Sequence, residues 1–182
     1  MKSAIGLIEL SSIAKGIEAS DAMLKRADIE IIVNRTICPG KYMILIGGDV
    51  DAVNASIETG IELSAEELVD HFIIPNVHPS IFPAISGITP HVDLHALGVI
   101  ESFSVASIIE AADAAVKSAS VELITVYLAM AIGGKGYVMF TGDVASVQTA
   151  VETGAAAISK KGLLVQKVVI PSPRKEILQS WL

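Results

Sequence analysis

Short apolar runs alternate with segments of helical periodicity along the first third of the chain. Residues 5–10 form a nearly continuous apolar run of strand length and predict a strand. The next segment predicts a helix with one largely apolar stripe, on which Ser20 is the single polar member. The apolar positions of that stripe are Ile13, Ile17, Leu24 and Ala27. Ser11 or Ser12 precedes the helix and can cap its first turn through a hydroxyl group.

The following residues predict two strands, a second helix and a closing strand. Strands over residues 29–37 and 42–46 flank Cys38-Pro39-Gly40-Lys41, which is typical of a turn because proline fixes φ and glycine tolerates positive φ. Asp49 can cap the second helix, and residues 71–75 form the last strand. The buried face of that helix is predicted to hold Val50, Val53, Ile57 and Ile61. The order βαββαβ predicts an α+β, ferredoxin-like (split βαβ) layer.

The whole pattern occurs twice. Ala4-Ile5-Gly6-Leu7-Ile8-Glu9 returns 92 positions later as Ala96-Leu97-Gly98-Val99-Ile100-Glu101, and 15 of the 29 positions from residue 4 to 32 are identical at this offset. Gly48-Asp49-Val50 returns as Gly142-Asp143-Val144. The chain is therefore predicted to be a tandem duplication, with the helices of the second half near residues 104–119 and 143–160.

A proline-rich segment separates the two copies. Pro79, Pro83 and Pro90 occur with Gly87 in the stretch that precedes Ala96, and proline disfavours both helix interiors and central strands. We therefore expect a first domain over residues 1–84, a linker over 85–95 and a second domain over 96–182.

Composition narrows the class of protein. The 182 residues are 52% hydrophobic and 18% charged, with a formal net charge of −7, which argues against a disordered chain and against a nonspecific nucleic-acid binder. The longest nearly pure apolar run, Leu123–Ile132, is about half of the roughly 20 residues that a membrane span needs. The N-terminus carries no signal-peptide pattern. A mean hydropathy of +0.60 without a membrane segment instead predicts an oligomer that hides apolar surface.

The repeated motifs resemble those of bacterial microcompartment shell domains. They are Ala-[Ile/Leu]-Gly-x-Ile-Glu, Glu-Ala-x-Asp-Ala-x-x-Lys-x-Ala, a Gly-Lys turn and Gly-Asp-Val before a helix, in unpermuted order in both halves. The resemblance implies a homotrimer whose six domains form a pseudohexameric tile. Such tiles pack against other shell proteins in a microcompartment shell within the cytoplasm, around enclosed enzymes that could include redox enzymes.

Cys38 is the only cysteine, so an internal disulfide is excluded. A lone cysteine is most often an inert, buried small hydrophobe, and a single thiolate cannot hold an iron–sulfur cluster. The segment around Cys38 is similar to the propanediol-utilisation type of tandem shell subunit. That resemblance implies one [4Fe–4S] cluster per trimer, on the threefold axis, with three ligands from Cys38 of three chains. A zinc site with three thiolates is the chemical alternative.

The resemblance also implies a pore at the centre of the tile. The loops facing it would be Cys38-Pro39-Gly40 in the first half and, two residues longer and without cysteine, the loop containing Gly133 and Gly134 in the second. A cluster there would have one of three roles. It would transfer electrons across the shell, be delivered to an enclosed enzyme, or bind an external ligand.

Three basic residues are candidates for the tile edge. Lys25 and Lys117 occupy equivalent positions late in the first helix of each half, and Arg174 follows the last strand. The resemblance implies that these side chains contact a neighbouring tile. The alternative for the lysines is a solvated helix end, where the helix dipole favours a positive charge.

Catalytic motifs are missing from the sequence. It contains no Ser-His-Asp order, paired catalytic carboxylates or dinucleotide fingerprint, so we do not expect an enzyme. Two other functions stay open, because a ferredoxin-like scaffold hosts many activities. One is a regulatory trimer that binds a small molecule, and the other is an enzyme with an inter-subunit site.

Overall fold

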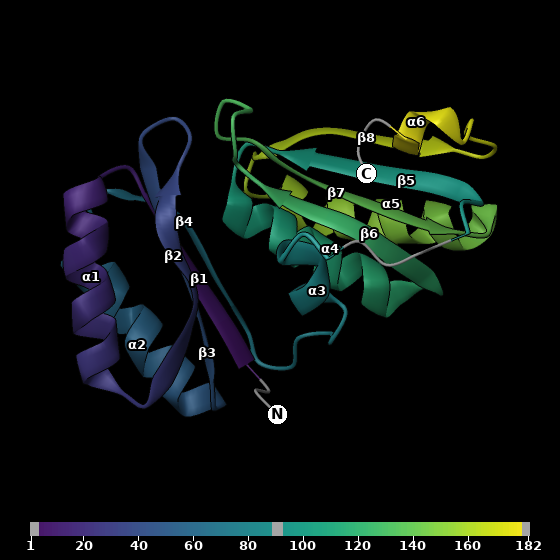
Figure 1. Cartoon of the computed structure of the whole chain (residues 1–182). Helices are drawn as coiled ribbons and strands as arrows, with labels where there is room; N and C mark the ends of the chain where they lie inside the picture. The colour runs from purple at the N-terminus through teal and green to yellow at the C-terminus, as the bar shows by residue number, and fades with distance from the viewer. Residues whose placement is uncertain (1–3, 89–92, 180–182) are drawn as a thin grey trace. The chain divides into compact units, whose positions relative to one another are not determined.

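The computed structural model describes residues 4–88 and 93–179, and these divide into two compact units. The first unit runs to Val77 and includes the loop Ala129–Gly134, whereas the second comprises His78–Leu128 and the chain from Lys135 onward. Each unit holds one four-stranded antiparallel sheet with two long helices on one face (Figure 1). This is the α+β, ferredoxin-like arrangement predicted for both halves, and that prediction is confirmed.

The first unit follows the order βαββαβ. Its sheet has the strand order β2-β3-β1-β4. The elements are β1 (Ala4–Leu10), α1 (Ile13–Arg26), β2 (Ile29–Ile37), β3 (Lys41–Gly48), α2 (Val50–Leu63) and β4 (Leu68–Ile74).

The second unit repeats this order and its strand register. Its sheet has the order β6-β7-β5-β8, and Ala96 pairs with Gly142 as Ala4 pairs with Gly48. The elements are α3 (Ile81–Ile85), β5 (Ala96–Ser102), α4 (Val105–Ser118), β6 (Val121–Leu128), β7 (Gly136–Gly142), α5 (Val144–Ser159), β8 (Leu164–Ile170) and α6 (Glu176–Gln179).

The repeated glycine of the first strand allows a helix to pack closely on the sheet. A Cβ atom on Gly6 would lie 2.6 Å from Ile57 Cγ1, and one on Gly98 would lie 2.9 Å from Val151 Cγ2. Real Cβ atoms do not approach so closely, so a larger residue would force the neighbouring side chains, including those of α2 or α5, to shift. Val53 and Ile57, both predicted on the inner face of the second helix, are fully buried in this contact.

The apolar stripe predicted on the first helix is not its buried face. Ile13, Ile17 and Leu24 are exposed, whereas Gly16, Ala19, Ser20 and Met23 face the sheet. Small residues permit this because Gly16 lies directly beneath the Tyr42 ring. The polar member Ser20 is satisfied inside, since its hydroxyl donates to Gly16 O at 2.7 Å and lies 2.9 Å from Asn34 Oδ1. An apolar stripe usually marks the buried face, but α1 has apolar residues on two faces.

The proline-rich segment contains a helix that the sequence did not suggest. The short helix α3 includes Pro83, which lies in the first turn, where backbone N–H groups have no partner within the helix and proline loses nothing. Ile81 and Ala84 are buried, and α3 packs against β6 and α4. The structure thus separates its two units between Val77 and His78, before the boundary expected near residues 84–95, because α3 packs with the second unit.

Three of the four long helices begin with a side-chain cap. Ser12 accepts from the Lys15 amide at 3.3 Å, and Ser104 accepts from the Ser107 amide at 3.1 Å. Asp143 accepts from the amide of Ser146 at 3.0 Å. Asp49 occupies the predicted N-cap position of α2 but makes no such bond.

Candidate functional site

The turn that carries Cys38 is a tight connection between β2 and β3. Cys38, Pro39 and Gly40 form the turn, and the Cys38–Pro39 peptide bond is cis. The Cys38 thiol is free and half-buried, while Pro39 and Gly40 are exposed. Gly40 has φ of +76°, and no atom lies within 4 Å of the place where its Cβ would be. The tip of this turn is therefore open on the side of Gly40.

The loop between β6 and β7 lies against this turn within the same compact unit. The Cys38 amide donates to the Ala129 carbonyl oxygen at 3.1 Å. A Cβ on Gly134 would lie 2.7 Å from both the Cys38 carbonyl oxygen and Pro39 Cδ. Gly133 is different, because nothing lies within 4 Å of its missing Cβ. The structure therefore brings four of the five predicted loop residues together and leaves Gly133 facing open space.

The β6–β7 loop has an uncommon backbone. Gly133 and Gly134 have φ of +65° and +83°, and Ala129 and Ala131 also take positive values, +50° and +59°. Glycine adopts this region freely, but alanine does so rarely. The glycines were expected in a turn, whereas the left-handed alanines had no signal in the sequence.

A buried ion pair stands beside the Cys38 turn. Lys41, the first residue of β3, pairs with Glu9 of β1, whose side chain is completely buried. The Lys41 ammonium also lies 3.5 Å from the Gly134 carbonyl oxygen. The second unit repeats the pair with Glu101 and Lys135, which are more exposed. The sequence signal that indicates these pairs is a repetition. The glutamate of the first strand and the Gly-Lys motif of the turn both occur in each half.

One chain offers one sulfur ligand at this place. Among residues 4–88 and 93–179, no group of three or more His, Cys, Asp or Glu side chains is close enough to hold a metal ion. The half-buried thiol and the open side of Gly40 fit a group shared between copies of the chain. The Cys38 amide would not bond to a sulfide of such a group, because it already donates to Ala129.

The three candidate edge residues have unequal surroundings. Lys25 pairs with Asp21 at 2.5 Å, and both side chains are exposed. Lys117 pairs with Asp113 at 2.5 Å, but Asp113 is nearly buried and also accepts from the His78 amide at 2.8 Å. Arg174 is exposed in the segment between β8 and α6.

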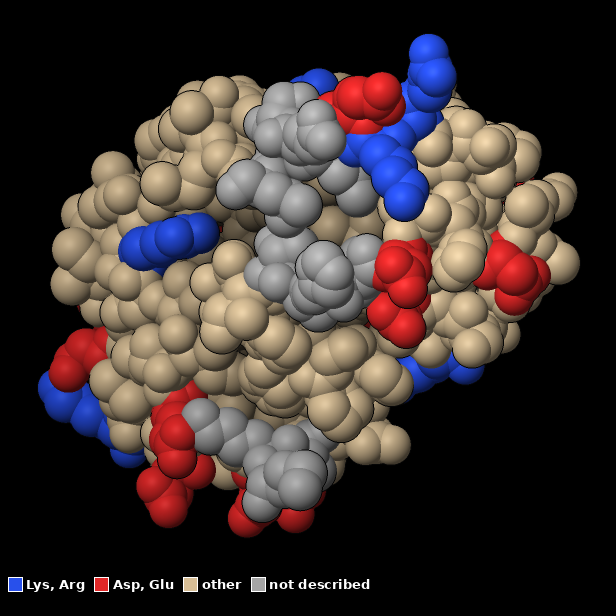
Figure 2. All heavy atoms as spheres, turned by 45° about the vertical axis from the view of Figure 1, so that its right-hand side comes forward, with Lys and Arg blue, Asp and Glu red and all other residues tan. Residues whose placement is uncertain are grey.

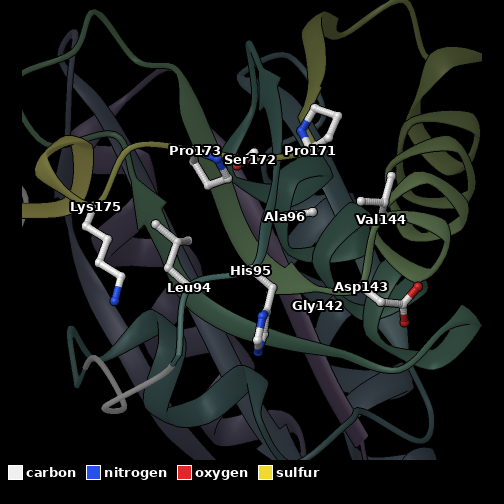
Figure 3. Close-up of a pocket in the computed structure, with 10 residues that line it drawn as sticks. All are labelled: Leu94, His95, Ala96, Gly142, Asp143, Val144, Pro171, Ser172, Pro173 and Lys175. Atoms are coloured by element: carbon white, nitrogen blue, oxygen red, sulfur yellow. The ribbon is translucent and has the colours of Figure 1, made fainter.

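A cavity of about 720 Å³ lies in the second unit near Arg174. It is found where β5 begins and where β7 and β8 end, which is the end of the sheet opposite the β6–β7 loop. Figure 3 shows Lys175 and Asp143 on opposite sides of His95, with their charged ends pointing apart. Asp143 is engaged with Ser146, whose hydrogen bonds lower the pKa of the Asp143 carboxyl group. These polar groups do not converge on one ligand position.

On the face shown in Figure 2, acidic and basic side chains are scattered among uncharged residues. No helix in the described part of the chain is long and apolar enough to cross a membrane.

Comparison with known sequences identifies the same domain in both halves. The model of the BMC domain matches residues 4–77 and 96–173. The bacterial microcompartment shell protein PduT of Citrobacter freundii is 48% identical over 177 residues, which cover 97% of this chain and 96% of that protein. The shell protein EutM of Salmonella typhimurium is 42% identical over 84 residues, 46% of this chain and 85% of that protein.

Solved structures show the same fold over nearly the whole chain. A microcompartment protein from Desulfitobacterium hafniense matches with a TM-score of 0.87 at 49% identity, covering 98% of this chain and 99% of that one. A fused, permuted hexameric shell protein of the RMM microcompartment shares the fold, with a TM-score of 0.66 at 18% identity over 87% of this chain and 82% of that one. The chain belongs to the BMC-domain family of bacterial microcompartment shell proteins, with two such domains in tandem.

Proposed function

We propose that this shell subunit assembles as a homotrimer, a pseudohexameric tile that holds a [4Fe–4S] cluster on its threefold axis for electron transfer across the shell. The observation that carries the proposal is Cys38, a free and half-buried thiol in a turn that is open at Gly40. Three copies of the turn around one axis would supply three thiolates to one cluster and leave one iron without a protein ligand.

Two exposed apolar surfaces support assembly into a ring. The first is the outer face of α1, formed by Ile13, Ile17 and Leu24. The second is the sheet face of the second unit that points away from α4 and α5, where Tyr127 stacks on Tyr137 and Val168 is 43% exposed. The two surfaces differ and belong to different units, so contacts between copies would be head-to-tail, and such contacts form a ring when the rotation between copies closes.

The chain itself would contribute the position and the negative charge of the Cys38 thiolates. The Cys38 thiolates would hold the iron, and the cluster would supply one-electron chemistry when bound. The Glu9–Lys41 pair ties the residue that follows the turn to the neighbouring strand β1. Since the cluster would occupy the centre of the tile, metabolites would not pass there.

Metal analysis of protein purified without oxygen tests this proposal. We expect about four iron and four sulfide per three chains, with visible absorbance that is lost in Cys38→Ser while the trimer remains. Zinc at one ion per three chains, or a trimer without bound metal after reconstitution with iron and sulfide, would contradict the cluster.

The edge residues complete the proposal. We expect Lys25, Lys117 and Arg174 to contact neighbouring shell proteins. Replacing both lysines by alanine should leave trimers intact but prevent extended two-dimensional sheets in electron micrographs. Normal sheets from this double variant would exclude the lysines from the edge contact.

A further inference from the structure

We propose that the loop Ala129–Gly134 is a brace that fixes the position of the Cys38 turn, with Gly134 as its positioning residue. The loop is the counterpart, in the second repeat, of the turn that carries the cysteine. It contains no cysteine but contacts the turn that does. The inference rests on the proposed function, because the brace would set the place of the thiolate that binds the cluster.

The turn is held at both of its ends. At its start, the Cys38 amide donates to the carbonyl oxygen of Ala129, a residue that is completely buried. At its end, the Lys41 ammonium lies 3.5 Å from the Gly134 carbonyl oxygen and pairs with the buried Glu9. Two separate contacts from one loop therefore restrict the three residues between them.

The contact at Gly134 leaves no room for a side chain. Its missing Cβ would lie 2.7 Å from the Cys38 carbonyl oxygen and from Pro39 Cδ, and 3.3 Å from Lys41 Cε. The first of these is a backbone atom, which cannot move aside without moving Cys38 itself. An alanine at this position must therefore displace the turn, the loop or both.

The loop keeps its shape against the preference of its residues. Ala129 and Ala131 stay in the left-handed region, which residues with a Cβ rarely occupy. Such conformations persist where surrounding contacts determine them, and for Ala129 the hydrogen bond from the Cys38 amide is one such contact.

Two adjacent glycines allow a matched test in the full-length chain without metal. Gly134→Ala and Gly133→Ala both place alanine at positive φ, but only Gly134 faces the Cys38 turn. The measurements are the rate of iodoacetamide alkylation of the single cysteine and the hydrogen exchange of the Cys38 amide. We expect both rates to rise about fivefold or more in Gly134→Ala relative to Gly133→Ala. Only the alanine at position 134 would weaken the contact that restrains the Cys38 turn, and local opening of the turn would then be more frequent.

Equal rates in the two variants would overturn the brace. Wild-type protein tests it independently of any variant, because the Cys38 amide must be protected from exchange if it donates to Ala129. Exchange of that amide at the rate of an unprotected amide would also overturn it. Should Gly134→Ala fail to fold, deletion of Ile132 and Gly133, which shortens the loop by two residues, replaces it with the same expected increase.

The cluster and the brace can fail separately, since these rates require no iron. Wild-type protein that binds no iron, together with a fast-reacting Gly134→Ala, would reject the cluster and retain the brace. Iron in the wild type and equal alkylation rates in both variants would reject the brace and retain the cluster.

Discussion

The two units differ in which of their faces they expose, although their backbones repeat. On α1, Ile17 is 58% exposed, whereas the equivalent Ile109 on α4 is completely buried. The sheet faces show the opposite: Phe72 is buried in the first unit, while the equivalent Val168 is 43% exposed in the second. Each unit thus exposes the face that the other buries. Duplication therefore gave one fold two different surfaces, as head-to-tail assembly requires.

The first prediction compares the two helix faces and has the largest expected effect. Ile109→Asp places a charge in a fully buried position and should cost about 4 kcal/mol or more, enough to prevent folding. Ile17→Asp should leave the fold of each chain intact, with a change of about 0.5 kcal/mol or less, but abolish the proposed trimer. Chemical denaturation measures the first effect, and light scattering after gel filtration measures the second.

A trimeric Ile17→Asp variant would show that the exposed apolar face of α1 is not needed for assembly. Ile17→Val is the matched control, because it keeps an apolar surface and should not change the assembly state.

The second prediction concerns the two Glu–Lys pairs. Glu9 is buried completely and Lys41 is 13% exposed, so Glu9→Gln leaves a largely buried ammonium without its charged partner and should cost about 3 kcal/mol. Glu101→Gln removes a half-exposed pair and should cost less than about 1 kcal/mol. Denaturant unfolding of both variants measures the difference, and equal costs would show that the two pairs have the same surroundings.

The third prediction concerns the two candidate edge lysines, Lys25 and Lys117, and the aspartates that pair with them. Asp113→Ala removes the acceptor of the His78 amide as well as the partner of Lys117, and we expect a cost of about 1–2 kcal/mol. Asp21→Ala removes an exposed pair on the helix surface and should cost about 0.5 kcal/mol or less. Faster hydrogen exchange at the His78 amide in Asp113→Ala alone would support this assignment, and an unchanged rate would contradict it.

The smallest effect is expected at the caps of α2 and α5. Asp143 bonds to Ser146, which holds its pKa below the ordinary 3.8, whereas Asp49 makes no side-chain cap bond. A lowered folded-state pKa contributes stability above pH 3.8 that is lost as the pH falls through the folded-state value. At pH 7, Asp143→Ala should therefore lower the melting temperature more than Asp49→Ala. The difference between the melting temperatures of the two variants should be smaller at a pH below 3.8. Melting curves of both variants at pH 7 and at such an acidic pH test this.

Local patterns in the sequence were sufficient to predict the strands and long helices of the repeated unit, their order and the duplication, but not the short helix α3. Runs such as 5–10 and turns such as Cys38-Pro39-Gly40 depend on neighbouring residues alone, and the return of Gly6 as Gly98 reports the same helix–sheet contact twice. The predicted apolar stripe of α1 is not the buried face of that helix, because a local pattern does not show which face the sheet covers. Periodicity reports apolar faces, but the packing of Gly16 under Tyr42 decides which of two faces the sheet covers.

The sequence by itself determined that this chain contains two copies of one shell domain and that its single thiol lies in a turn. Only the tertiary structure decided what surrounds that turn. Residues 38 and 129 are far apart in the chain, and neither residue type signals the bond between the Cys38 amide and the Ala129 carbonyl oxygen. Backbone contacts carry no side-chain code, so the fold alone brings the cysteine turn and the β6–β7 loop together.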